Sequence, residues 1–292
     1  MKPAPFEYYA PQSVPEALSL LAEYGYDAKV LAGGQSLVPM MNFRLVQPTV
    51  VVDINNIPEL TGIQGNKKGL QLGAMVRHAQ AEKDPLVKEK APLIFESMPQ
   101  IATRQIRNRG TVGGSLSHAD PSAELVVVTT ALNANFKILK QDGERVVPAS
   151  EFFVGLLMTV MEPEELLVEI EIPSLPARSG WSLQEVARRP HDFALVGVVA
   201  VVTLDRKGRC EEARLVYLSA GDGPVSAPEA AALLKGEMIT QDLIVAAAEK
   251  ASTDEIDPGS DIHATAEFRR HLANVLTRRA LEEAHQRAGE KK

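Results

Sequence analysis

Cysteine is almost absent from this chain of 292 residues, which contains only Cys210. A single thiol excludes an internal disulfide, a CxxC redox pair and an iron–sulfur cluster held by this chain alone. Histidine pairs of the H-x-x-x-H type are also missing, because the six histidines are scattered along the sequence. We therefore expect no metal site here, and any redox chemistry must rely on a cofactor that thiolates do not hold.

Basic residues and long apolar runs are scarce as well. Lys and Arg total 31 against 38 Asp and Glu, a net charge of −7, which argues against the concentrated basic face of a nucleic-acid-binding protein. No apolar run approaches the length of a membrane span, and residues 1–12 lack the apolar stretch of a signal peptide. We expect a soluble, cytoplasmic protein without nucleic-acid or membrane partners.

Residues 1–55 predict a small βαβ unit. Ser13 and Glu16 form a capping box ahead of an apolar helix face, and Gly25 is placed to end that helix. Residues 28–31 and 49–54 have the pattern of strands, and residues 37–45 can form a helix between them. Strands and helices that alternate at this spacing favour a parallel sheet.

Two further units follow, and both are of the α+β class. Residues 56–175 contain expected helices at 77–82 and 84–97 and expected strands at 70–74, 134–139, 144–147 and 165–172, which indicate a largely antiparallel sheet. Residues 173–180 are rich in Pro, Gly and Ser and mark our expected domain boundary. Residues 180–292 predict three strands, at 181–188, 195–204 and 213–219, and two helical stretches, of which 267–288 is the longer.

Two Gly-Gly segments are the clearest chemical signal. Gly33 and Gly34 follow a predicted strand directly, and Gly113 and Gly114 follow Thr111. Glycines in such turns let successive backbone N–H groups point the same way, which is the arrangement that binds phosphate. Neither segment is a G-x-G-x-x-G fingerprint or a P-loop. Each alone is more typical of an ordinary tight turn, whereas the two together fit a clamp for a pyrophosphate as well as they fit two such turns.

Other candidate sites have weaker support. Residues 113–117 lack the second glycine of a G-x-S-x-G nucleophile elbow, which argues against a hydrolase. His118 and Asp120 could perform acid–base chemistry or could form a loop end with local hydrogen bonds. Arg188 and Arg189 could meet a phosphate or a partner carboxylate, or form a surface pair. We assign no catalytic acid, base or nucleophile.

Residues 31–37 (LAGGQSL), 107–115 (RNRGTVGGS) and 119–121 (ADP) resemble the FAD-binding medium subunit of molybdenum hydroxylases. That family includes subunits of carbon monoxide dehydrogenase, xanthine dehydrogenase and dehydrogenases for quinoline, nicotine and related N-heterocycles. The resemblance covers essentially the whole chain, including residues 165–173, 188–194 and 270–281. It implies the α+β FAD-binding fold of the alcohol-oxidase and molybdenum-hydroxylase flavoproteins, followed by a C-terminal three-stranded sheet with helices.

The resemblance also implies a set of FAD-binding residues. Two segments would hold the pyrophosphate through backbone amides and the hydroxyls of Ser36, Thr111 and Ser115; their residues are Leu31, Ala32, Gly33, Gly34, Gln35, Ser36, Leu37, Thr111, Gly113, Gly114 and Ser115. Around the rest of the cofactor, Asp120 belongs to the third motif, Glu124 would contact ribityl or nearby hydroxyls, Ile101 and Leu167 would line the flavin site, and Phe193 would stack on the isoalloxazine ring. Ser115 replaces the Asn common in the carbon monoxide and xanthine enzymes, which points towards the N-heterocycle dehydrogenases.

The function that the resemblance implies is electron transfer within a complex. A large partner would carry molybdenum–molybdopterin, and a small partner would carry two [2Fe–2S] clusters that pass electrons to FAD on this chain. The expected assembly is a dimer of heterotrimers. The expected electron acceptor is NAD+, a quinone or oxygen, and the expected substrate is an N-heterocycle, a purine or carbon monoxide. One alternative is a self-sufficient FAD-dependent oxidase or reductase, and another is a nucleotide-binding module without enzymatic activity.

Overall fold

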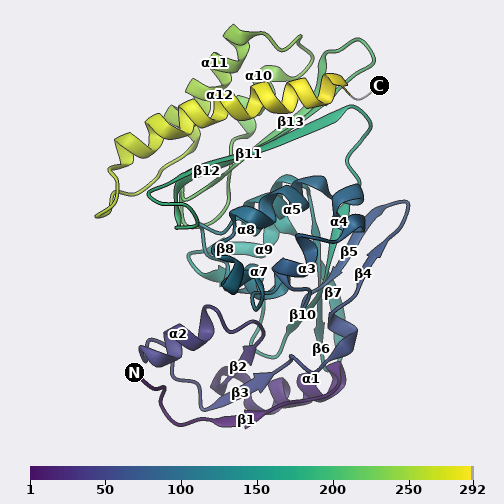
Figure 1. Ribbon diagram of the computed structural model, residues 1–292, viewed down its shortest axis with the longest axis vertical. Helices are drawn as coiled ribbons and strands as arrows, with labels where there is room; N and C mark the ends of the chain where they lie inside the picture. Colours follow the sequence, from purple (N-terminus) through teal and green to yellow (C-terminus); the bar gives the residue numbers. More distant parts are fainter. Residues whose placement is uncertain (291–292) are drawn as a thin grey trace.

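The computed structural model describes residues 1–290, which form three tiers stacked along the long axis of the molecule (Figure 1). The tiers follow the chain from an N-terminal sheet, through a central unit, to a C-terminal sheet with its helices. Each tier has its own hydrophobic core, and helices are mixed with parallel and antiparallel strands. The predicted α+β class is confirmed.

The N-terminal tier is built on a parallel three-stranded sheet in the order β1 (Glu7–Tyr9), β3 (Val50–Asp53), β2 (Ala28–Leu31). Helix α1 (Val14–Tyr24) connects β1 to β2 by way of the 3-10 turn η1 (Gly25–Asp27), and the short helix α2 (Leu37–Asn42) lies between β2 and β3. The predicted βαβ unit is therefore confirmed, with every strand of this sheet pointing the same way.

The structure confirms both predicted ends of helix α1 and shortens the predicted helix α2. Ser13 accepts a hydrogen bond from the Glu16 amide at 3.4 Å, and the Glu16 carboxylate accepts one from the Gln12 amide at 2.8 Å. Gly25, with φ of +49°, ends α1 as predicted. Helix α2 stops at residue 42 instead of 45, because Arg44 adopts a left-handed conformation with φ of 58°.

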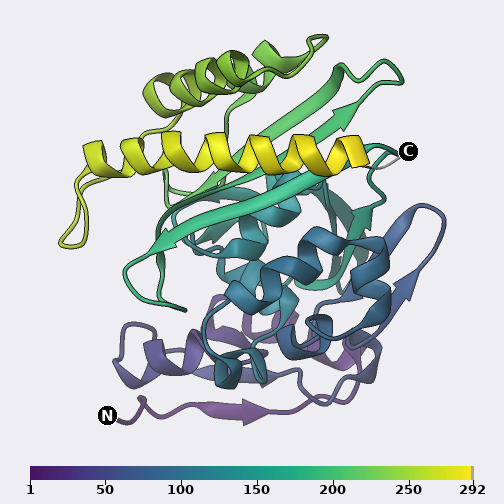
Figure 2. The same cartoon turned by 45° about the horizontal axis from the view of Figure 1, so that its top comes forward.

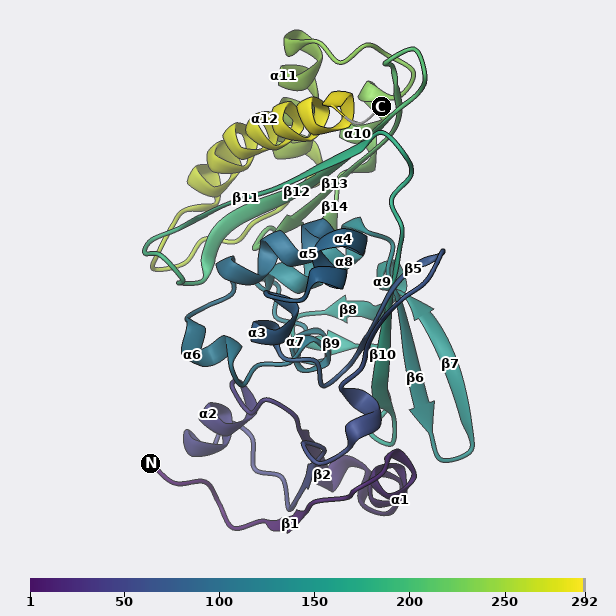
Figure 3. The same ribbon diagram turned by 45° about the vertical axis from the view of Figure 1, so that its right-hand side comes forward.

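The central tier contains an antiparallel five-stranded sheet with helices packed on one side of it (Figure 3). Its strand order is β4 (Ile63–Gly65), β5 (Gly69–Gly73), β10 (Leu166–Pro173), β6 (Asn135–Lys140), β7 (Gly143–Pro148), which confirms the predicted antiparallel pairing. The remaining elements are η2 (Pro58–Leu60), α3 (His78–Ala81), α4 (Pro85–Lys90), α5 (Pro92–Ser97), η3 (Met98–Gln100), α6 (Arg104–Arg107), α7 (Val112–His118), α8 (Glu124–Ala131), α9 (Ala149–Phe152), β8 (Phe153–Gly155) and β9 (Met158–Thr159).

The structure corrects two sequence predictions in this tier, one in part and one in full. The helix predicted over residues 84–97 is two helices, because Pro92 cannot donate the hydrogen bond that would continue α4, and Ala91 leaves the helical region with φ of −139° and ψ of 63°. Gly113 and Gly114 do not form a turn. They lie in the first turn of helix α7, which Thr111 caps.

The C-terminal tier is an antiparallel sheet of four strands in chain order: β11 (Ser179–Ala187), β12 (Ala194–Leu204), β13 (Cys210–Leu218) and β14 (Val225–Ser226). The prediction of three strands missed β14, which is only two residues long. Every residue of β12 is buried, because Val199 and Val201 face the central core while Val198 and Ala200 face the C-terminal core.

Helices cover the outer face of this sheet. Helix α12 (Ala266–Glu290) lies lengthwise across β11 and β12, as Figure 2 shows. Helices α10 (Pro228–Leu234) and α11 (Gln241–Lys250), with the π-helical turn η4 (Ala251–Glu255), complete the layer, so the prediction of two helical stretches missed one helix. No helix within residues 1–290 is long and apolar enough to cross a membrane.

Candidate cofactor-binding site

The loop of residues 32–36 follows β2 at the carboxyl edge of the parallel sheet, where open α/β sheets bind their ligands. Gly34 has φ of +74°, a conformation that side chains other than hydrogen rarely adopt. Within residues 1–290, the amides of Gly33, Gly34, Gln35 and Ser36 donate to no backbone or side-chain acceptor. Successive amides without partners are the donors from which an anion site is made.

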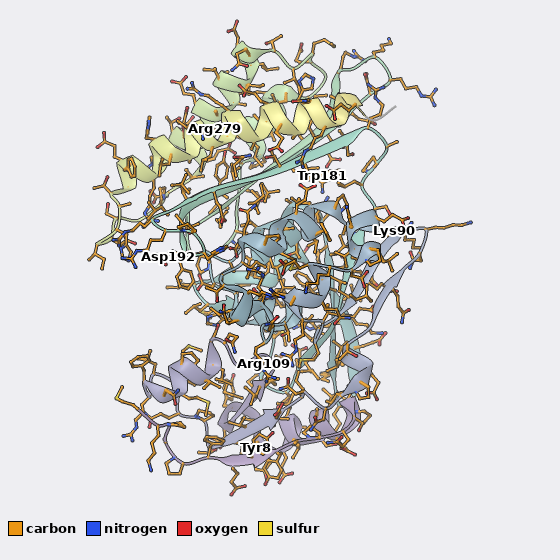
Figure 4. All side chains as sticks on the ribbon, viewed as in Figure 1. Tyr8, Lys90, Arg109, Trp181, Asp192 and Arg279 are labelled. Carbon is orange, nitrogen blue, oxygen red and sulfur yellow. The ribbon has the colours of Figure 1, made fainter. Side chains whose placement is uncertain are left out.

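The loop lies directly against the second Gly-Gly segment. A Cβ atom on Gly33 would be 2.5 Å from the Arg109 carbonyl oxygen and 2.8 Å from Gly110 Cα, so only glycine allows this approach. A Cβ atom on Gly114 would be 3.5 Å from the Ala32 Cβ. Figure 4 shows Arg109 between the N-terminal and central tiers. The fold thus brings together two segments that are about 80 residues apart in the sequence.

The second segment offers fewer amides than the sequence suggested. The Val112 and Gly113 amides donate to the carbonyls of Val76 and Ala74, at 2.9 and 2.8 Å. Helix α7 uses two more, because the Gly114 amide donates to Thr111 Oγ1 at 3.0 Å and the Ser115 amide to the Thr111 carbonyl at 3.0 Å. The expectation of free amides at residues 112–115 is therefore wrong. What this segment can offer is the hydroxyl hydrogens of Thr111 and Ser115.

A polar network lies behind both segments, and sequence analysis did not identify its members. Asn55, two residues beyond β3, donates from Nδ2 to the Ala32 carbonyl at 2.8 Å. Arg77 donates from Nη2 to Asn55 Oδ1 at 2.5 Å and from Nη1 to the Arg109 carbonyl. The available signal was the position of Asn55, just after a β-branched strand whose carboxyl end lies beside the Gly33–Gly34 loop.

His78 is a further member of this network. Its backbone amide donates to the Gly110 carbonyl at 3.0 Å, and its ring Nε2 lies 2.9 Å from the Thr111 carbonyl oxygen. Burial lowers the pKa of His78 to about 4, so the ring is neutral at pH 7. Since a carbonyl can only accept, Nε2 carries the ring hydrogen.

Four other expected site residues lie outside this cluster of loops. Ile101 and Leu167 are 8% and 3% exposed and pack in the central hydrophobic core. Asp120 accepts a hydrogen bond from the Ser122 amide at 2.8 Å, which is the local loop-end bond weighed as the alternative for this position. Glu124 is the first residue of α8 and is half-buried.

Glu124 interacts with a second acidic residue that the sequence did not reveal. Burial raises the pKa of Glu124 to about 7, and the nearby charge of Asp120 adds to this effect. Glu185, on β11, has its pKa raised to about 8 by burial and by the charge of Glu124. Its Oε2 atom is buried without a hydrogen-bond partner in the described part of the chain. The two carboxyl groups thus share a poorly solvated space between the central and C-terminal tiers.

Phe193 lies in the loop that joins β11 to β12. The side chain is 70% exposed, and its amide donates to the Asp192 carboxylate at 3.0 Å. Figure 4 shows Asp192 at the outer end of this hairpin, on the same side of the molecule as helix α2 in Figure 1. Arg188, in the same loop, lies 2.5 Å from His263 through Nη1 and Nδ1. An exposed aromatic ring on a loop is available to cover a ligand.

The single cysteine, Cys210, lies in the C-terminal tier and not beside the Gly33–Gly34 loop. Cys210 is 1% exposed in the core of the C-terminal tier, and burial raises its pKa to about 11. A thiol that stays protonated in a separate core cannot attach a flavin held by the Gly33–Gly34 loop. Within residues 1–290, no cluster of three or more His, Cys, Asp or Glu is placed to hold a metal ion.

Comparison with known proteins gives two family matches that together span most of the chain. Residues 4–175 match the FAD-binding domain in molybdopterin dehydrogenase. Residues 181–284 match the C-terminal domain of the carbon monoxide dehydrogenase flavoprotein.

Individual relatives agree with these matches over nearly their full length. The chain is 40% identical to the 6-hydroxypseudooxynicotine dehydrogenase complex subunit alpha of Paenarthrobacter nicotinovorans, over 99% of this chain and 97% of that one. Carbon monoxide dehydrogenase from Hydrogenophaga pseudoflava superposes with a TM-score of 0.95 at 37% identity, covering 98% of this chain and 99% of its own. Quinoline 2-oxidoreductase from Pseudomonas putida 86 superposes with a TM-score of 0.93 at 38% identity, with 99% of each chain covered. The chain belongs to the family of FAD-binding medium subunits of molybdenum-containing dehydrogenases.

Proposed function

We propose that this chain is the electron-relay subunit of a molybdenum hydroxylase. In this proposal, a large partner bearing molybdenum–molybdopterin oxidises the substrate, and a small partner bearing two [2Fe–2S] clusters delivers the electrons to this chain. The absence of any cysteine besides Cys210 requires that the clusters belong to another chain. FAD, when bound, supplies the ability to accept electrons singly and release them singly or as a pair to NAD+, a quinone or oxygen.

Four successive amides, at Gly33–Ser36, have no partner in the described part of the chain and lie against residues 109–114, and this observation carries the proposal. These amides, with the hydroxyls of Ser36, Thr111 and Ser115, would hold the pyrophosphate of FAD. Donors without partners in a preformed loop cost little to organise when an anion binds, because no protein hydrogen bond has to break. The residues present therefore fit a dinucleotide cofactor.

Other residues would act around the flavin end of the cofactor. We propose that Phe193 covers the isoalloxazine ring, since its side chain is exposed and aromatic, and that it limits access of the acceptor. Glu124 would contact ribityl hydroxyls from the start of α8. Ile101 and Leu167, which belong to the central core, would form the apolar floor of the flavin site. None of these residues needs to transfer a proton or form a covalent bond.

We further propose an N-heterocycle as the substrate of the complex. The similar proteins include enzymes whose names specify quinoline and 6-hydroxypseudooxynicotine, and Ser115 departs from the Asn common in carbon monoxide and xanthine enzymes. The expected assembly is a dimer of heterotrimers, and the substrate is selected at the molybdenum site of the large partner.

The proposal is tested by following flavin absorbance without oxygen. The complete complex, mixed with quinoline, nicotine, a purine or carbon monoxide, should show bleaching of the flavin with one of them, whereas the isolated chain loaded with FAD should not. Bleaching of the isolated chain by a substrate would identify a self-sufficient oxidase or reductase. A flavin that no partner and no substrate ever reduces would identify a binding module instead.

A further inference from the structure

Five carbonyl oxygens around the candidate site accept hydrogen bonds from neighbouring residues: those of Ala32, Gly33, Arg109, Gly110 and Thr111. Asn55 donates to the Ala32 carbonyl, Arg77 to the Arg109 carbonyl, and His78 to the carbonyls of Gly110 and Thr111. The Gly33 carbonyl accepts a hydrogen bond from Gln35 Nε2 at 3.1 Å. Every one of these peptide groups therefore has its negative end engaged by the protein.

The amides of the same loop have the opposite status. Those of Gly33, Gly34, Gln35 and Ser36 have no partner within residues 1–290. A peptide group is a dipole, so fixing its oxygen also fixes the direction of its N–H group. In two of these peptide groups a side chain binds the carbonyl while the amide has no partner within residues 1–290: Asn55 binds the Ala32 carbonyl, which shares its peptide group with the Gly33 amide, and Gln35 binds the Gly33 carbonyl, which shares its group with the Gly34 amide. This is the polarity that a phosphate requires.

Asn55 and Arg77 also join two tiers of the molecule. Asn55 follows β3 in the N-terminal tier, and Arg77 precedes α3 in the central tier. Their contacts form a closed circuit, because the Ala32 carbonyl binds Asn55, Asn55 binds Arg77, Arg77 binds the Arg109 carbonyl, and that carbonyl packs against Gly33. Asp53 anchors the circuit, since it accepts hydrogen bonds from Asn55 and, at 2.5 Å, from Tyr8.

The charge of Asp53 fits this role. Burial alone would raise its pKa, but hydrogen bonds from Tyr8 and Asn55 hold the pKa of Asp53 below its ordinary value. The carboxylate therefore stays ionised and keeps accepting from the Asn55 side chain. That fixes the amide of Asn55 with its oxygen towards Arg77 and its nitrogen towards Ala32.

We propose that Asn55 and Arg77 are positioning residues for the dinucleotide cofactor, which together fix the Gly33–Gly34 loop and the Arg109–Ser115 segment at the spacing of a pyrophosphate. This inference rests on the proposed function, because it assumes that FAD binds at these loops. Neither side chain is required to touch the cofactor. Their role is to keep the two backbone segments aligned, with the Gly33 amide left free to bind the cofactor.

The test compares FAD affinity across variants of the full chain stripped of flavin. Asn55→Ala should raise the Kd for FAD about tenfold, the factor expected for one lost hydrogen bond that orders a binding loop. Arg77→Ala should raise it by tenfold or more, because two charge-assisted bonds are lost. Since both residues belong to one circuit, the double variant should bind only slightly worse than Arg77→Ala. The exposed Asn56→Ala and Arg206→Ala are matched controls and should bind as the parent chain does.

A second ligand shows whether the effect acts at the pyrophosphate, and a thermal unfolding curve for each variant separates positioning from a general loss of structure. ADP carries the pyrophosphate without the isoalloxazine ring, so its Kd should rise by the same factor as that for FAD. If Arg77→Ala does not fold, Asn55→Asp replaces it, since it keeps the side-chain volume and the acceptor for Arg77 but removes the donor to Ala32. Unchanged affinity for FAD and ADP in folded Asn55 variants would overturn the proposal. Failure of the parent chain and both controls to bind FAD would instead refute the proposed function.

Discussion

Gly33 provides the sharpest test of how the two candidate segments fit together. In Gly33→Ala, the new methyl group would lie 2.5 Å from the Arg109 carbonyl oxygen and 2.8 Å from Gly110 Cα, both backbone atoms. Relief requires the loop to move away from residues 109–114 by about 1 Å, at a cost of roughly 1–3 kcal/mol for overpacking. If that cost falls on cofactor binding, the Kd for FAD rises about 5- to 150-fold.

The assay is a titration of the flavin-free chain with FAD, followed by quenching of flavin fluorescence, with a thermal unfolding curve for each protein. Gly62→Ala is the control, because its methyl group would meet only Gln64 Nε2, at 3.8 Å. We expect Gly62→Ala to bind FAD as the parent chain does. A folded Gly33→Ala that binds FAD with the parent affinity would refute the argument that the contact between the two segments forms the site.

Three further outcomes are expected. Phe193→Ala should change the rate at which the reduced complex reacts with oxygen or NAD+ while most FAD stays bound, and equal rates with every acceptor would contradict the covering role. Thr111→Val removes the side-chain oxygen that accepts the hydrogen bond of the Gly114 amide, and it should lower the free energy of unfolding by about 1 kcal/mol in urea titrations. A Thr111→Val variant as stable as the parent chain would contradict this capping role. Because the pKa of Glu185 is raised to about 8, the folded chain binds this proton more tightly than the unfolded chain, so stability should fall as pH rises from about 4.5 through 8. Glu185→Gln should remove that part of the pH dependence and be more stable than the parent by ~2 kcal/mol above pH 8; the exposed Glu211→Gln is the control, and an equal gain in both would refute the assignment.

Local signals in the sequence predicted the local structure well. The Ser13–Glu16 capping box and Gly25 set both ends of α1, because these residues act on backbone groups within a few positions of themselves. The run of β-branched residues at 49–54 predicted β3 within one residue at each end. The class of fold and the FAD-binding family followed from the pattern and from the two Gly-Gly motifs.

Buried helices and long-range contacts were harder to predict. Residues 125–131 of α8 are all buried, so the helix shows no alternation of polar and apolar faces and gave no periodic signal. The Gly113–Gly114 pair has the pattern of a turn, yet it lies in helix α7. Gly113 is needed there for packing, because a Cβ atom on this residue would lie 2.5 Å from the Cβ of Ala74. No local pattern records a contact between residues so far apart in the chain.

The same limit applies to the candidate site. The position of the glycine loop was predicted, but its partners come from two separate segments of the chain and match no motif: Asn55 follows β3, and the adjacent residues Arg77 and His78 begin α3. Which amides remain free depends on where every carbonyl of the neighbouring segments is directed. That is a property of the tertiary structure, and it explains why four amides expected to be free in residues 112–115 are in fact paired.

Purification from the native source under mild conditions tests the electron-relay assignment most directly. Co-purifying chains would be identified by mass spectrometry, and flavin, molybdenum and iron would be measured in the same sample. We predict FAD on this chain, molybdenum with one large partner and iron with one small, cysteine-rich partner. A lone flavoprotein that contains neither metal and still oxidises a substrate would contradict the account, since this chain would then have to hold the catalytic site itself.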